Sequence, residues 1–154
     1  MNCALPSRGR SDDGSAAVEA ALVMSLLVLL VVGTAELGRA FWTYHTMLFA
    51  VEEAGRFAMI HSHLPPLSCR RQGPAASCPT PSDTPLANCA AAQVRQILSS
   101  YRVRGVDVSV AEDDAGGSPA TITICASYSF DFVAPQLLPQ NSLNLTSRLT
   151  VPLT

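Results

Sequence analysis

The chain has 154 residues, of which 48% are hydrophobic and 14% are charged, and its formal net charge at pH 7 is −2. This length holds one modest domain together with a helix. The small net charge and the scattered arginines argue against a nucleic-acid-binding surface, so no nucleic-acid partner is expected.

The chain begins with a polar stretch and continues into a long apolar run. Residues 1–14 are small and polar, and we interpret them as a leader peptide. In residues 15–35 the one charged side chain is Glu19, and about 20 apolar residues suffice to span a bilayer as a helix. Arg8 and Arg10 precede this predicted transmembrane helix. By the positive-inside rule they predict a cytoplasmic N-terminus and an external C-terminus.

Gly14 and Glu19 are the candidate functional residues. A glycine directly before a helix can take the extended conformation that a protease requires. A carboxylate inside a membrane helix is costly unless it is paired, which makes Glu19 a functional-site hypothesis. Cleavage after Gly14 would give Ser15 a new α-amino group, and this cation could neutralise Glu19 of the same or an adjacent subunit.

The helical pattern continues beyond the apolar run, through residues 36–61. Apolar residues recur there at alternating steps of four and three, which predicts one face of an amphipathic helix. No proline interrupts the sequence between Ser15 and His63, so we expect one helix from Ser15 to about Ile60. The predicted face consists of Leu37, Phe41, Tyr44, Leu48, Val51 and Gly55, widened by Ala40, Met47, Ala50, Ala54 and Phe57.

The rest of the chain predicts a small external domain. Prolines and serines indicate a loop over residues 62–86. Residues 87–154 then carry a short helix up to Tyr101, for which Asn88 is a candidate N-cap. Three segments with a two-residue apolar rhythm follow, around residues 106–110, 122–132 and 143–151. The expected fold class is therefore α+β, with a membrane-inserted helix followed by a small domain that has a short helix and a three-stranded antiparallel sheet.

Four of the five cysteines lie beyond the apolar run, which suits disulfides formed in an oxidising compartment. Four cysteines allow three connectivities, and the sequence does not choose among them. We predict Cys69–Cys78, which would close the proline-rich loop, and Cys89–Cys125, which would tie the short helix to the sheet.

No motif for catalysis or metal binding stands out. His45, His61 and His63 lack nearby carboxylate ligands, and the sequence contains no nucleophile elbow or phosphate-binding loop. We expect no metal, no cofactor and no enzymatic activity.

The N-terminal third resembles a known family. The polar leader, Gly14, Glu19 and the apolar helix look like the class III signal of type IV pilin-like proteins. The continuation Glu36-Leu37-Gly38-Arg39-Ala40, then Tyr44 and residues 50–58, resembles the TadE-like minor pseudopilins of tight-adherence (Tad/Flp) pili, so that the resemblance covers about residues 10 to 60.

This resemblance implies a pilin-like external domain and cleavage by a prepilin peptidase between Gly14 and Ser15. It also implies a role for Glu19 in processing and assembly. The implied partners are that peptidase, other pilins or pseudopilins and the pilus assembly platform. The implied location is the bacterial inner membrane, crossed once, with the C-terminal domain in the periplasm or, after assembly, at the pilus or cell surface.

Two alternatives remain open. Gly33-Thr34-Ala35 resembles a signal-peptidase site, and cleavage there would release a secreted or periplasmic binding module that begins near Glu36. In the second alternative the protein is an ordinary single-span membrane protein that keeps its leader.

Overall fold

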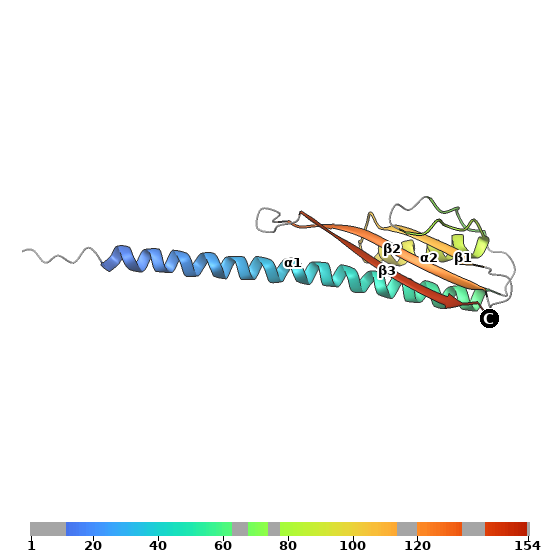
Figure 1. The fold of residues 1–154 in the computed structure, drawn as a ribbon, viewed down its shortest axis with the longest axis horizontal. Helices are drawn as coiled ribbons and strands as arrows, with labels where there is room; N and C mark the ends of the chain where they lie inside the picture. The colour runs from blue at the N-terminus through green and yellow to red at the C-terminus, as the bar shows by residue number, and fades with distance from the viewer. Residues whose placement is uncertain (1–11, 63–67, 74–77, 114–119, 134–140, 154) are drawn as a thin grey trace, which may run out of the picture. The chain divides into compact units, whose positions relative to one another are not determined.

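The computed structural model describes residues 12–62, 68–73, 78–113, 120–133 and 141–153. The chain divides into two compact units, Met1–Leu37 and Gly38–Thr154. Within the described residues there are two helices and three strands (Figure 1): α1 (Asp12–His61), α2 (Pro85–Ser100), β1 (Asp107–Asp113), β2 (Thr121–Asp131) and β3 (Ser142–Pro152). The predicted α+β fold, with a long N-terminal helix, a short helix and a three-stranded antiparallel sheet, is confirmed.

Helix α1 begins two residues before Gly14 and ends at His61. At the other end, Nδ1 of His61 lies 2.9 Å from the main-chain oxygen of Phe57. Gly14 therefore lies in the first turn of α1 and not, as the sequence led us to expect, before the helix.

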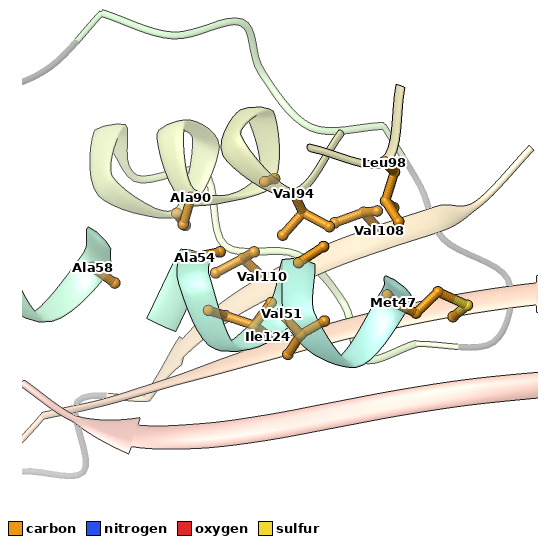
Figure 2. Packing of buried hydrophobic residues seen from close by; sticks show 14 of the residues in the cluster. Met47, Val51, Ala54, Ala58, Ala90, Val94, Leu98, Val108, Val110 and Ile124 are labelled. Atoms are coloured by element: carbon orange, nitrogen blue, oxygen red, sulfur yellow. The ribbon is translucent and has the colours of Figure 1, made fainter. Parts of the chain in front are cut away.

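The three strands form one antiparallel sheet in the order β1-β2-β3. Val110 pairs with Ile124 and Ile124 pairs with Leu149, so these apolar side chains share one face. In the second unit this face packs against α2 and the later turns of α1, and Figure 2 shows Met47 and Val94 among the core side chains. The alternating pattern thus supplies a sheet with one buried apolar face.

The buried face of α1 is rotated from the predicted one. Val51 and Gly55 are buried as expected, but Leu37 is 69% exposed and Phe41 is 62% exposed. Small residues let the helix approach the sheet and α2 closely, whereas bulky side chains at these positions would hold it away. The buried apolar residues of α1 are Ala40, Met47, Ala50, Val51, Ala54 and Ala58.

Helix α2 starts earlier than predicted because Thr84, not Asn88, is its N-cap. Thr84 has an extended backbone, and its hydroxyl accepts a hydrogen bond from the main-chain N–H of Ala87 at 3.2 Å. Pro85 then takes the first helical position, where its missing N–H costs nothing. Asn88 lies inside the helix, is buried, and its side-chain oxygen accepts from the N–H of Gln72 at 2.9 Å.

All four cysteines of the second unit form disulfides, but in another pairing. Cys69 bonds to Cys89 with a Cα–Cα distance of 5.1 Å, and Cys78 bonds to Cys125 at 5.8 Å. The predicted pairing, Cys69–Cys78 and Cys89–Cys125, is wrong. The described parts of the loop lie along α2 and β1, so each loop cysteine meets a cysteine of a regular element.

Candidate functional site

The first unit presents apolar side chains on every side of α1. The large apolar residues from Val18 to Val31 are between 45% and 67% exposed. Among the described residues, α1 is the helix long and apolar enough to cross a membrane, and its most apolar stretch is not buried within the chain. A single N-terminal helix of this kind is compatible with a single-pass membrane protein.

The hydroxyl groups of Ser25 and Thr34, within the apolar run, are satisfied within the helix. Ser25 donates to the main-chain oxygen of Leu22 at 2.8 Å, and Thr34 donates to that of Leu30 at 2.9 Å. Hydrocarbon offers no hydrogen-bond partners, so internal satisfaction is what a membrane helix requires of its polar groups. This leaves Glu19 as the polar group of the run that calls for a partner of its own.

Gly14, Ser15 and Glu19 all lie on α1 and are exposed. Ser15 and Glu19 are four residues apart, so they occupy the same face of the helix on successive turns. A Cβ added to Gly14 would meet no atom within 4 Å, so packing within the chain does not require a glycine there. The expected extended conformation at Gly14 would require unwinding of the first turn.

The second unit carries a group of exposed aromatic residues that the sequence did not single out. This aromatic surface comprises Phe41, Trp42, Phe49 and Tyr101, each more than 45% exposed. Phe49 and Tyr101 meet edge to face with centroids 6.3 Å apart, which joins α1 to the end of α2. The sequence signal for this surface is that Phe41, Trp42 and Phe49 lie on the same helix as the small alanines that are buried.

The described residues hold no group of three or more His, Cys, Asp or Glu that could bind a metal ion. Between the loop and α2 there is a hollow of about 250 Å³. Its polar side chains bind one another, since Arg71 pairs with Asp83 at 2.9 Å and Asn88 bonds to both Asp83 and Gln72. His63 lies outside the described residues.

Among the described residues, Arg95 has a shifted pKa. Burial, and secondarily the positive charge of Arg70, lower the pKa of Arg95. The Arg95 guanidinium still donates to the main-chain oxygen of Val108 at 3.1 Å, so this side chain bonds to the edge of the sheet.

Comparison with known families matches the segment that carries these features. Residues 14–56 match the family described as TadE-like protein. Over this segment, the chain is TadE-like. The match begins at Gly14, includes Glu19 and the exposed apolar run, and extends through the three exposed aromatic residues of α1, Phe41, Trp42 and Phe49. No curated protein and no solved structure matches the chain.

The match confirms the resemblance drawn from the sequence and indicates a protein associated with the Tad pilus. TadE-like pilus components are structural proteins, and the match over residues 14–56 suggests association with other pilus components. The residues from 57 onward lie outside the match, so the disulfide-bonded part of the second unit is described from its own structure.

Proposed function

We propose that this TadE-like chain is a minor pseudopilin that acts in the assembly of Tad/Flp-type adhesive pili. The observation that carries the proposal is the family match from Gly14 to Arg56 over a helix whose apolar side chains are exposed. The chain acts through packing rather than catalysis.

The processing step falls at the start of α1. A prepilin peptidase cuts between Gly14 and Ser15 after the first helical turn unwinds. The new α-amino group of Ser15 then lies one turn from the Glu19 carboxylate on the same helix face. Pairing of these charges, within one chain or between neighbours, lowers the cost of holding Glu19 in the bilayer and favours one register between packed helices.

The orientation places the peptidase and the domain on opposite sides of the inner membrane. Arg8 and Arg10 keep the N-terminus cytoplasmic. The two disulfides of the second unit suit the oxidising periplasm. Both features support a single pass with the C-terminal domain in the periplasm.

The exposed side chains of α1 supply the assembly contacts. Apolar groups exposed over the helix and the aromatic surface are typical of interaction sites. Other pilins or pseudopilins and the pilus assembly platform are the partners proposed for this helix.

A second candidate is a secreted or periplasmic binding module released by signal peptidase near Ala35. One observation favours it: the second compact unit begins at Gly38, three residues after Ala35. Against it, α1 continues as a regular helix through Gly33, Thr34 and Ala35, and cleavage there would cut an element of which part belongs to the core.

The N-terminus of the mature protein distinguishes these functions. Mass spectrometry of the protein from its native host should find Ser15 as the first residue. Glu36 would instead establish the released module, and Met1 would establish an ordinary membrane anchor.

A matched pair of variants tests the site. Gly14→Leu should leave full-length precursor in the membrane, whereas Ala35→Leu should be processed as the parent is. Normal maturation of Gly14→Leu, or a block in Ala35→Leu, would overturn the pseudopilin proposal.

A further inference from the structure

The sheet of the second unit has two edges, and they differ in how their main-chain groups are satisfied. An edge strand presents alternate N–H and C=O groups to its surroundings and can pair with a strand of another chain. β1 forms one edge and β3 forms the other. An edge is open to another strand where its outward main-chain groups have no partner within the chain.

Outward main-chain groups of three residues of β1 are bonded by residues from outside the sheet. The main-chain oxygen of Val108 accepts from Arg95 at 3.1 Å. The N–H of Val110 donates to Gln72 at 2.8 Å, and the N–H of Glu112 donates to the hydroxyl of Ser82 at 2.8 Å. The main-chain groups of Val108, Val110 and Glu112 therefore point away from β2, and each of these residues has a hydrogen-bond partner outside the sheet.

Gln72 takes the place of a neighbouring strand. Its side-chain oxygen accepts from the N–H of Val110, and its Nε2 donates to the oxygen of the same residue at 3.1 Å. A residue of an adjacent antiparallel strand would make the same two bonds with its own N–H and C=O. Nε2 also donates to the main-chain oxygen of Ser82 at 3.1 Å, which links the two parts of the loop.

Ser82 bonds to outward main-chain groups of β1 at two residues, Val110 and Glu112. Its N–H donates to the main-chain oxygen of Val110 at 3.0 Å. Its hydroxyl also donates to the main-chain oxygen of Glu112 at 3.3 Å. We call residues 69–73 and 78–82 the edge cover, since together they satisfy the outward groups of Val110 and Glu112.

Both parts of the edge cover are tied down by a disulfide. Cys69, three residues before Gln72, is bonded to Cys89 of α2. Cys78, four residues before Ser82, is bonded to Cys125 of β2. The covalent links therefore join the cover to the two elements that flank β1.

The opposite edge has no such cover. Hydrogen bonds from Leu153 to Ala120 at one end of β3 and from Phe132 to Asn141 at the other place its odd-numbered residues toward β2. The outward main-chain groups of the even-numbered residues, from Asn144 to Thr150, have no partner within the described part of the chain.

We infer that the edge cover is a disulfide-held device that closes β1 to strand pairing and that reduction releases it. In each release a dithiol breaks one S–S bond. The protein gains two electrons and two protons as two cysteine thiols, and the reductant becomes a cyclic disulfide. The inference does not depend on the pilus function.

Amide hydrogen exchange measured by NMR on the full chain in detergent micelles tests this inference directly. The reporters are the amides of Val110 and Glu112, which bond to the cover, and the controls are those of Ser109 and Ala111, which face β2. Dithiothreitol should speed exchange at both reporters by roughly tenfold or more and leave the controls unchanged. Unchanged reporters after complete reduction, or equal acceleration of all four amides, would overturn the inferred release.

Variants with both disulfides intact test the cover itself. Gln72→Leu should speed exchange at Val110, and Ser82→Ala should speed it at Glu112, each by about fivefold or more for the lost bond. Gln96→Leu, on the exposed side of α2, is the matched control and should change neither amide. If the Val110 amide exchanges as slowly in the Gln72→Leu variant as in the Gln96→Leu variant, the Gln72 side chain does not protect the edge of β1.

Discussion

Helix α1 lies close to the sheet at Gly55, and enlarging this residue should destabilise the second unit. A Cβ placed there would lie 2.8 Å from Cδ2 of Leu149, 3.8 Å from Cγ1 of Val151 and 4.0 Å from Cδ1 of Ile124. A single methyl group needs only the tip of the half-buried Leu149 to turn aside. Four carbons at this position would also press on Val151 and Ile124.

The expected loss follows from two opposing contributions. Overpacking of a close-packed core costs about 1–3 kcal/mol, and replacement of a helical glycine by leucine gains about 0.8 kcal/mol in helix propensity. With the upper end of that range, since three side chains are crowded at once, Gly55→Leu should lower the free energy of unfolding by about 2 kcal/mol. Gly55→Ala should change it by less than about 1 kcal/mol, because its propensity gain offsets the displacement of Leu149.

Gly38 provides the matched control on the same helix. A Cβ there meets no atom within 4 Å, so Gly38→Leu should keep the propensity gain without the packing cost. Urea unfolding of the full chain in a mild detergent, followed by near-ultraviolet circular dichroism, gives both free energies. Equal stability of Gly55→Leu and Gly38→Leu would refute the argument that this glycine is required by packing.

Two smaller perturbations test other parts of the second unit. Ser147→Ala should raise the free energy of unfolding by about 1 kcal/mol, because its buried hydroxyl has no hydrogen-bond partner among the described residues; the exposed Ser129→Ala serves as the control, and a loss of stability in Ser147→Ala would contradict the assignment. Thr84→Ala should cost about 1 kcal/mol and speed amide exchange at Ala87, whereas Thr84→Ser keeps the capping hydroxyl and should behave as the parent.

Hydrophobic periodicity predicted the helices and strands because buried residues recur at steps of three and four along a helix and at every second residue along a strand. The alternation around Val110, Ile124 and Leu149 identified three strands, and the structure pairs these residues across one apolar face. The uninterrupted helical pattern likewise predicted α1. The predicted face includes five of the six buried apolar residues of α1 but is centred on bulkier ones, because hydrophobicity ranks Phe41 above Ala40, whereas close packing favours the alanine.

The sequence contains local signals for the true start of α2. The predicted loop over residues 62–86 includes Pro85, yet proline is favoured at the first position of a helix, and α2 begins there. Because Pro85 lies inside the helix, Thr84 is the N-cap, and the Asn88 side chain accepts a hydrogen bond from the N–H of Gln72. The position of Pro85 thus explains both the earlier start of α2 and the different role of Asn88.

The disulfide pairing and the edge cover could not be predicted because they depend on contacts between distant segments. Gln72 and Val110 are 38 residues apart, and a proline-rich composition indicates a loop without saying where the loop lies. The correct pairing follows only once the loop is placed along β1, since Cys69 and Cys78 then face α2 and β2 rather than each other. A glutamine side chain that replaces a strand leaves no periodic signal, so the residue that closes the sheet is recognised from its hydrogen bonds alone.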